Sequence, residues 1–400
     1  MEMLIHWVWY ALISKLPVAM KLSLLERFSD PEDIFHTQNF DHIPELTGDM
    51  KDVLEKKDLQ PAQTVLKQCA DRKIRILTIR DAGYPSRLRN IPDPPLVLYY
   101  KGMLPDFESQ PVIGVVGTRK ASAYGLNNAR QISGQIAACG GLVVSGGAAG
   151  IDTMALQGAL DTGKPVVAVL GCGADVVYPK TNRALFAKIE ENGCLLSEYL
   201  PGTEPRPWQF PERNRIISGL SNGVLVVEAP EKSGALITAK DAFEQGRDVF
   251  AIPGNIGIAS GMGSNRLLQD YAHAVLSGWD VLKDYADQYS GVQQRQAMPY
   301  RPAEPIMAPA KVAQSVFVQT DKKDVDNPTL NAYSDLENSY PGLTEREKQV
   351  LGCVGYSPQP VDAVIANAGL PAAEMLGILT RLTVKGLVLR HPGNLISARK

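Results

Sequence analysis

The chain has 400 residues, of which 44% are hydrophobic and 21% are charged, and its formal net charge at pH 7 is −2. This length exceeds what one hydrophobic core normally organises, so two or three domains are expected. A nearly neutral chain lacks the overall positive charge of many nucleic-acid-binding proteins, and any binding of a polyanion must therefore come from a local patch.

The sequence shows no uncharged apolar run of membrane-spanning length, and its apolar segment Ile5–Leu16 is followed by no signal-peptide cleavage site. Both features predict a cytoplasmic protein with no membrane partner. The five cysteines are scattered, without a CxxC pair or a neighbouring histidine cluster, which predicts reduced thiols and no structural zinc.

Residues 1–75 are expected to form a small helical, SAM-like module. Helix-compatible segments at 7–16, 22–28 and 50–57 are separated by proline and glycine stops. Modules of this kind often present a helix-hairpin-helix turn to a DNA backbone, but residues 16–20 contain no glycine for such a turn. Protein contact or scaffolding is therefore the preferred interpretation, and DNA contact is the alternative.

Residues 76–110 are expected to form an extended connection with short strands. Alternating apolar and β-branched residues predict the first strand at 74–78. Pro92, Pro94 and Pro95 then fix an extended conformation that leads into a second short strand. We expect this second strand at the edge of the main sheet.

Residues 111–288 alternate strand and helix signals, which predicts an α/β domain with a doubly wound, mostly parallel, Rossmann-like sheet. The expected strands are Val112–Val116, Leu142–Ser145, Val166–Leu170, Cys194–Ser197, Gly223–Glu228, Val249–Ile252 and Ala274–Leu276. The intervening helices are expected to begin near Tyr124, Ile151, Thr181, Pro211, Ser233 and Asn265.

The last hundred residues divide into two parts. Residues 289–340 are proline-rich and polar with little periodicity, which predicts a flexible linker. Residues 341–400 show three helix patterns, the third at Ala372–Val384, followed by two short strands that could form a wing. This order is typical of a winged-helix domain, which can bind either DNA or protein.

The most distinctive stretch runs from Leu142 to Asp152. Apolar residues lead into a loop containing Gly146, Gly147 and Gly150, and a helix-compatible segment follows. Glycines let a ligand approach the backbone closely, and the amide groups that begin a helix favour a phosphate. The Gly-Gly-x-x-Gly spacing matches neither a dinucleotide fingerprint nor a Walker loop, so a simple tight turn is the alternative.

Basic residues concentrate where the strands are expected to end, which is the edge at which open α/β sheets bind ligands. The segment 111–283 has fifteen basic and fifteen acidic residues. Six of the basic residues are expected at this edge: Arg119, Lys120, Lys180, Arg183, Arg213 and Arg215. The pattern predicts a site for a phosphate or a polyanion. The alternative is ion pairing with Asp152, Asp175 or Glu212.

Aromatic residues at the same edge could stack on bases. These are Tyr178, Trp208 and Phe210. Core packing is the alternative for all three and the preferred interpretation for Phe210.

Catalytic groups are scarce in the α/β segment 111–288, because His273 is its only histidine and no strand is followed by a Walker loop. Binding without turnover, with no cofactor and no metal, is therefore expected.

The sequence resembles the DNA-processing protein A family, DprA/Smf. The motifs that carry the resemblance are Asp93–Pro95, Gly117–Arg119, Ser145–Asp152, Gly171–Pro179, Phe210–Ser221, Ser233–Ala239 and Glu244–Gly254. The resemblance implies a homodimer, formed through the Rossmann-like domain, that binds single-stranded DNA without sequence specificity. It further implies that the protein loads the RecA recombinase onto that DNA during natural transformation.

The resemblance also assigns roles to residues. It places Arg119 and Lys180 at DNA-contacting basic positions and the Ser145–Gly150 loop at a site for the DNA backbone. Arg183 stands where some members carry a base-stacking aromatic side chain. With the loops that share this edge, the residues expected to bind nucleic acid are Gly117, Thr118, Arg119, Lys120, Ser145, Gly146, Gly147, Ala148, Gly150, Lys180, Asn182, Arg183, Arg213, Asn214, Ser233 and Gly234.

Two other functions remain as alternatives. Related Rossmann-like enzymes cleave the base from nucleoside monophosphates with a glutamate in a glycine-rich loop. The corresponding stretch here, Ser233–Asp241, lacks that glutamate. The second alternative is a structural or regulatory protein that meets duplex DNA or a protein partner only through its winged helix.

Overall fold

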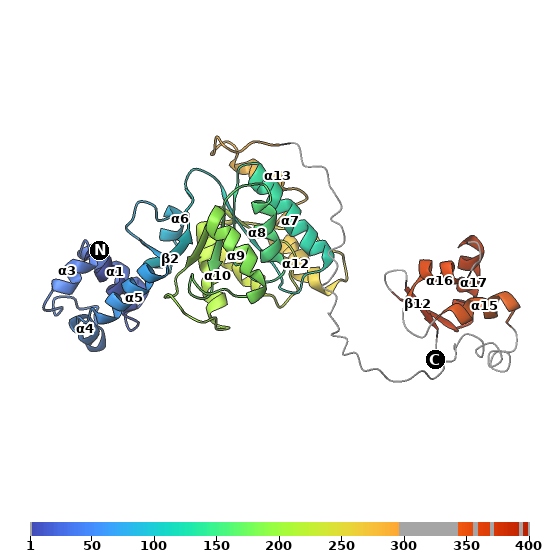
Figure 1. Cartoon of the computed structure of the whole chain (residues 1–400), viewed down its shortest axis with the longest axis horizontal. Helices are drawn as coiled ribbons and strands as arrows, with labels where there is room; N and C mark the ends of the chain where they lie inside the picture. Colours follow the sequence, from blue (N-terminus) through green and yellow to red (C-terminus); the bar gives the residue numbers. More distant parts are fainter. Residues whose placement is uncertain (1, 296–342, 355–358, 369–371, 392–394, 399–400) are drawn as a thin grey trace, which may run out of the picture. The chain divides into compact units, whose positions relative to one another are not determined.

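The computed structural model describes residues 2–295, 343–354, 359–368, 372–391 and 395–398. The chain forms two compact units, Met1–Ala308 and Pro309–Lys400, which are drawn in Figure 1.

A nine-stranded sheet organises the first unit. Its strands are β1 (Arg75–Thr78), β2 (Val97–Gly102), β3 (Val112–Val116), β4 (Leu142–Ser145), β5 (Val166–Leu170), β6 (Cys194–Ser197), β7 (Gly223–Val226), β8 (Asp248–Ala251) and β9 (His273–Ala274). They lie in the order β1-β2-β6-β5-β4-β3-β7-β8-β9. The seven strands from β3 to β9 are parallel, which confirms the doubly wound Rossmann-like sheet.

Helices cover both faces of this sheet because successive strand residues point to opposite sides. Ile113 and Val115 pack in a core with α7 (Ala123–Ala138), α8 (Ile151–Leu160), α9 (Arg183–Asn192) and α13 (Gly278–Leu282). Val112 and Val116 pack in the opposite core with α10 (Gln209–Leu220), α11 (Gly234–Glu244) and α12 (Met262–Asp270). Short 3₁₀ turns are η1 (Lys180–Asn182), η2 (Ala259–Gly261) and η3 (Lys283–Tyr285).

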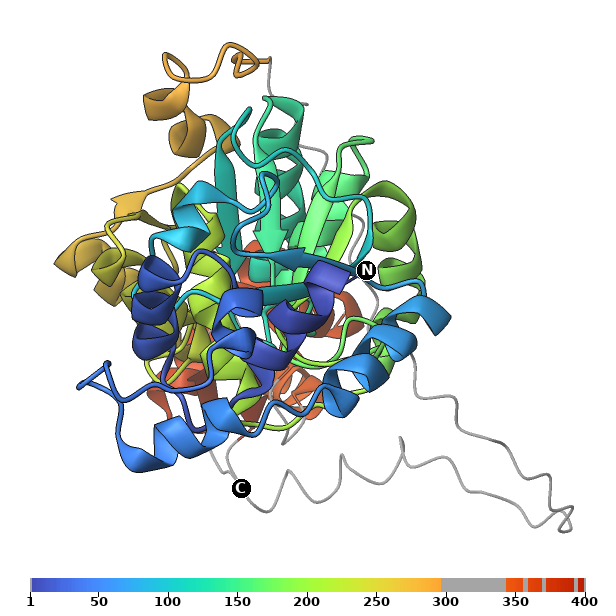
Figure 2. The same cartoon turned by 90° about the vertical axis from the view of Figure 1, so that its left-hand side faces the viewer.

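The expected N-terminal helices are present, and the structure adds α3 and α5 to them. The helices of this part are α1 (Glu2–Leu12), α2 (Val18–Arg27), α3 (Pro31–His36), α4 (Gly48–Glu55), α5 (Gln60–Asp71) and α6 (Ser86–Arg89). The blue helices of Figure 2 face the viewer. Their buried residues belong to the same core as α10 and α11, so this module is packed onto one face of the sheet.

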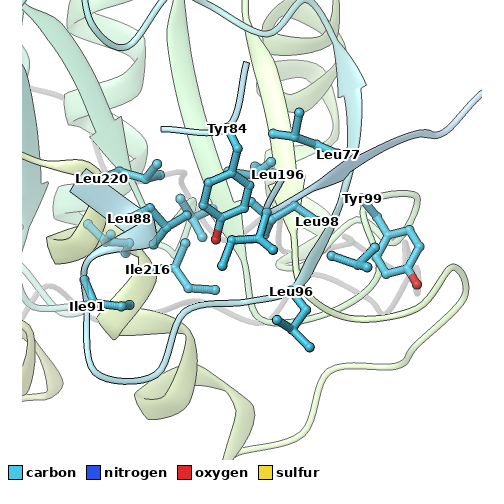
Figure 3. Close-up of a cluster of buried hydrophobic side chains, with 14 of the residues drawn as sticks. Leu77, Tyr84, Leu88, Ile91, Leu96, Leu98, Tyr99, Leu196, Ile216 and Leu220 are labelled. Atoms are coloured by element: carbon cyan, nitrogen blue, oxygen red, sulfur yellow. The ribbon is translucent and has the colours of Figure 1, made fainter. Parts of the chain in front are cut away.

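The second short strand does not lie at the sheet edge, contrary to expectation. Strand β2 pairs antiparallel with β6 on one side and with β1 on the other, so β1 forms the edge. Figure 3 shows why this extension is stable: Leu77, Leu98 and Leu196 come from three adjacent strands and cluster with Ile216 and Leu220 of α10. The prolines between β1 and β2 shape this connection and do not separate it from the sheet.

Ordered packing continues past the expected start of the linker at residue 289. Val292 is buried in the sheet core, and the Gln293 amide donates to the carbonyl of Cys139. The Tyr289 hydroxyl accepts a hydrogen bond from Arg87 at 2.7 Å and another from Asn222 at 3.1 Å. The remainder of the predicted linker, from residue 296, lies outside the described residues.

The second unit contains the winged-helix elements. They are α15 (Glu345–Cys353), β10 (Gln359–Pro360), α16 (Val361–Ala368), α17 (Ala372–Val384), β11 (Val388–His391) and β12 (Leu395–Ala398). Thr344 and Glu347 form the capping box that begins α15. Residues 369–371, between α16 and α17, lie outside the described residues.

Among the described residues, no helix combines the length and the apolar character that crossing a bilayer requires.

We expect Gly158→Ala to destabilise the first unit. A Cβ atom at this position of α8 would lie 2.0 Å from the carbonyl oxygen of Arg130 in α7. The two helices would have to move apart, which should lower the free energy of unfolding by about 1–3 kcal/mol. Gly48→Ala is the matched control, because a Cβ there would have no atom within 4 Å. Denaturant unfolding of both variants measures the difference, and equal stabilities would contradict this account.

Candidate nucleic-acid interface

The structure brings the loops after β3, β4 and β5 together at the carboxyl edge of the sheet. The Ile151 amide donates to the carbonyl of Thr118 at 3.3 Å, which joins the loops that follow β4 and β3. The Asn182 side-chain amide donates to the carbonyl of Gly147 at 3.0 Å, which joins the loops that follow β4 and β5. Arg119, Lys180 and the glycine loop therefore share one edge of the molecule.

The glycine loop, Gly146–Gly150, has a conformation that requires its glycines. Gly147 and Gly150 have φ angles of +66° and +84°, which other residues rarely adopt. A Cβ at Gly150 would also lie 2.4 Å from the carbonyl oxygen of Thr118. The sequence predicted that a ligand would lie close to this loop. In the structure, the backbone of Thr118 and Arg119 lies close to it, and this contact places the N-terminus of α8 beside Arg119.

Arg213 lies under the glycine loop and holds it in place. Its side chain is 3% exposed and donates to the carbonyl of Gly146 at 2.6 Å and to that of Val169. Asp152 is buried beside it and accepts a hydrogen bond from the Ala148 amide at 3.3 Å. Burial raises the pKa of Asp152 to about 6, although the charge of Arg213 opposes this shift. Burial also lowers the pKa of Arg213.

Four residues that were predicted to contact DNA have side chains that point into the protein. Arg213 supports the glycine loop from below. The Ser145 hydroxyl donates to Val115 at 2.6 Å, Asn182 donates to Gly147 and to the Thr153 hydroxyl, and Asn214 donates to the carbonyl of Gly234 at 3.3 Å. All four are buried, and their side chains make hydrogen bonds within the edge itself.

The other predicted residues differ in their exposure. The exposed ones are Arg119, Lys120, Lys180, Arg183 and Gly234. The half-buried ones are Gly117, Thr118, Ala148, Gly150 and Ser233, and the buried ones are Gly146 and Gly147. Ser233 caps α11 through a hydrogen bond that its hydroxyl accepts from the Ala235 amide at 3.3 Å. Four cationic side chains thus remain available at the surface of this edge.

Two aromatic rings form a platform beside Arg119. The Arg119 guanidinium carbon lies 4.7 Å from the centre of the Phe210 ring, which places a cation over an aromatic face. The Tyr178 ring lies 5.4 Å from Phe210 at an interplanar angle of 41°, and Tyr178 is 38% exposed. Phe210 is half-buried, and one face of its ring packs against the Arg119 guanidinium.

Arg215 forms ion pairs with acidic side chains, which was the alternative to phosphate binding. It donates two hydrogen bonds of 2.8 Å to the Glu198 carboxylate and one of 3.1 Å to Asp93. These partners differ from the three acidic residues considered from the sequence. A guanidinium engaged on both sides is poorly placed to bind a phosphate, and Arg215 instead ties α10 to the loop after β6 and to the connection before β2.

Sequence reasoning did not find the role of Glu228. This residue follows β7 and is 4% exposed. Its carboxylate accepts from the Ser122 amide at 2.9 Å, and its carbonyl accepts from the Thr118 amide at 2.8 Å. Glu228 therefore fixes both ends of the loop that carries Arg119, at the point between β3 and β7 where the strand order reverses. The available signal was an acidic residue at the end of an otherwise apolar predicted strand.

The described residues contain no group of three histidine, cysteine or acidic side chains arranged to hold a metal ion.

Comparisons with known proteins agree with this architecture. Residues 75–286 match the family model of DNA recombination-mediator protein A, and residues 335–394 match the DprA winged helix domain. Protein Smf of Synechocystis is 37% identical over 342 residues, which cover 85% of this chain and 83% of that protein. DNA processing protein DprA of Streptococcus pneumoniae is 44% identical over 218 residues, covering 54% of this chain and 75% of that protein.

The fold comparison points the same way. The X-ray structure of DNA processing protein A from Streptococcus pneumoniae aligns with a TM-score of 0.59 and 35% identity. The alignment covers 70% of this chain and 96% of that one. The family model spans more than half of the sequence, and the Synechocystis relative is matched over most of its length. The chain therefore belongs to the DNA recombination-mediator protein A family, to which proteins named DprA and Smf also belong.

Proposed function

We propose that this protein binds single-stranded DNA without sequence specificity at the carboxyl edge of its sheet, and that it does so without catalytic turnover. The observation that carries the proposal is the grouping of Arg119, Lys120, Lys180 and Arg183, all exposed, around the glycine loop and the start of α8. Cationic side chains and helix-terminal amides are the groups that bind phosphate. Contacts to phosphates carry no sequence information, so the binding is sequence-tolerant.

The aromatic platform favours a single strand over a duplex. Tyr178 is partly exposed beside Arg119, and a base can stack on such a ring only when it is not paired within a helix. A strand-end site of this kind reaches phosphates and splayed bases of a flexible strand more readily than the groove of a duplex. The proposed substrate is therefore single-stranded DNA. Membership of the family adds the proposal that this DNA is met in the cytoplasm after uptake during natural transformation.

Loading of the RecA recombinase onto that strand is the further part of the proposal, and family membership supports it. Relatives of the chain are named DNA processing proteins, and the matched family model describes a recombination mediator. A protein that holds the strand by its phosphates and leaves most bases accessible is suited to such a transfer. The absence of the glycosidase glutamate from Ser233–Asp241 supports binding over base cleavage.

We also propose that two copies pair through the Rossmann-like domain at its β9 edge. Apolar side chains are exposed around this edge, among them Ile256 at 99%, Leu276 at 82% and Phe243 at 58%. Strand β9 pairs with β8 on one side only and leaves its outer side unpaired in the sheet. An exposed apolar patch beside a free strand edge is typical of a protein interface.

The winged helix is the second candidate for DNA binding, and its ion pairs weigh against it. Arg381, the one basic residue of α17, and Lys385 both contact the carboxylate of Glu347, at 3.3 and 2.9 Å. Arg346 pairs with Glu374. These charges are compensated within the unit, so we expect this domain to contribute little to binding of single-stranded DNA.

The double variant Arg119→Ala with Lys180→Ala should bind oligodeoxythymidine more weakly and with less dependence on salt. Each phosphate contact that is lost should reduce the negative slope of log K against log salt by about 0.7. Lys164→Ala is the matched control, because Lys164 is exposed and precedes β5 at the opposite edge of the sheet. Fluorescence anisotropy at several salt concentrations gives both quantities. An unchanged slope in the double variant would argue against direct phosphate contact.

Deletion of residues 341–400 should leave affinity for the single strand nearly unchanged and duplex affinity weak. The reason is that four exposed cations surround the glycine loop of the first unit, whereas Arg346, Arg381 and Lys385 of the second unit form ion pairs. Gel shifts with an oligodeoxythymidine and a duplex of equal length measure both. Loss of single-strand binding on deletion, together with full binding by the Arg119 and Lys180 double variant, would assign the activity to the winged helix.

Leu276→Asp should convert the dimer to a monomer, because a charge would then lie in the proposed apolar interface. Sedimentation velocity measures the change. Met103→Asp is the control, since Met103 is 66% exposed next to β2, on the other side of the sheet. A wild-type protein that is monomeric at high concentration, or a Leu276 variant that stays dimeric, would refute this interface.

A further inference from the structure

A cavity of about 530 Å³ lies where the N-terminal helices meet the sheet domain. Its walls come from Ala11 of α1, Val18 of α2, Val97 of β2 and the segment from Glu198 to Gln209. All of these belong to the same compact unit. The volume falls within the usual range for sites that hold small organic groups.

The cavity is connected through α10 to the proposed phosphate edge. Trp208 lines the cavity and is 51% exposed just before α10 begins. Two residues later, Phe210 supports Arg119. The Tyr199 ring lies 6.3 Å from Trp208 at 77°, and the Tyr199 hydroxyl donates to the carbonyl of Gln209, which holds this aromatic pair in place. Trp208, which lines the cavity, and Phe210, which supports Arg119, therefore both lie at the start of α10.

The charges around the cavity favour a neutral group over a phosphate. Lys21 and Arg206 are balanced by Glu198 and Glu204 among its lining residues. Both oxygens of Glu198 accept hydrogen bonds from Arg215, and the Lys21 ammonium donates to the carbonyl of Ala11 at 3.0 Å. The rest of the lining is largely aliphatic and aromatic. Flat apolar rings with a few polar atoms at their rim fit this chemistry, and a nucleobase is such a ring.

We propose that this cavity accepts a nucleobase of the same DNA strand, stacked on Trp208, so that the N-terminal helices form one wall of a base site. The proposal rests on the single-strand binding proposed above. It gives the N-terminal module a role in DNA binding that needs no helix-hairpin-helix turn. It also separates the interface into a phosphate part, at Arg119 and Lys180, and a base part at Trp208.

Trp208→Ala tests the base part. We expect the affinity for oligodeoxythymidine to fall about 5- to 150-fold, the range for one lost base–aromatic stack, with the salt slope unchanged. Trp208→Phe should restore most of the affinity, because a phenyl ring can still stack. An abasic oligonucleotide of the same phosphate count should bind wild type and the alanine variant equally well. Thermal melting of each variant shows that the fold is retained.

Val18→Phe tests the cavity itself, because it fills the space from the α2 side and leaves Trp208 intact. We expect it to weaken binding of oligodeoxythymidine and to leave binding of the abasic strand unchanged. Photocrosslinking with 5-iododeoxyuridine should in addition attach the DNA to the peptide that contains Tyr199 and Trp208. If the Trp208→Ala and Val18→Phe proteins both bind with normal affinity and the crosslinks lie elsewhere, the base site is refuted. The proposed function still stands in that case, provided that wild type binds the single strand. Failure of wild type to bind any single strand would overturn both.

Discussion

The buried contact between Arg213 and the carbonyls of Gly146 and Val169 is the interaction on which the proposed interface depends. It fixes the glycine loop to the end of β5, and Asp152 balances the buried charge from the start of α8. A Cβ at Gly146 would lie 2.5 Å from the Arg213 guanidinium, so that glycine is required by this support. The exposed cations can be arranged around the loop because the loop itself is held rigidly from within.

A second buried carboxylate completes this arrangement. Glu228 anchors the loop that carries Arg119, at the reversal of strand order. The two supports come from α10 and from the end of β7, which are distant in sequence from the loops that they hold. The edge thus has an inner layer of buried charged and polar groups and an outer layer of exposed basic ones. In our proposal, the outer layer contacts DNA and the inner layer keeps its geometry.

Much of the fold could be predicted because local signals were sufficient. The parallel strands are short apolar runs, such as Val112–Val116, and each is followed by turn residues. The position of β2 could not be predicted, because its pairing with β6 depends on contacts about ninety residues away in the chain. Helix α3 has only six residues, too few for a periodic pattern. Strand polarity correctly indicated which loops meet, but not which of their side chains point inward.

Arg119 and Arg213 illustrate that limit. Both are arginines that belong to one predicted edge, yet one is exposed over Phe210 and the other is buried beneath Gly146. The difference comes from contacts with residues that are far away in the sequence. The residue types near each arginine therefore do not indicate which of the two is buried. The same holds for the cavity beside Trp208, whose walls come from α1, α2, β2 and the segment from Glu198 to Gln209.

Hydrogen–deuterium exchange of the full-length protein, with and without a single-stranded oligonucleotide, tests the central claim most directly. The account predicts that DNA slows exchange in the peptides that contain residues 117–120, 146–153 and 178–183, and leaves the winged-helix peptides unchanged. Protection confined to residues 361–391, with unchanged exchange in the glycine loop, would contradict it.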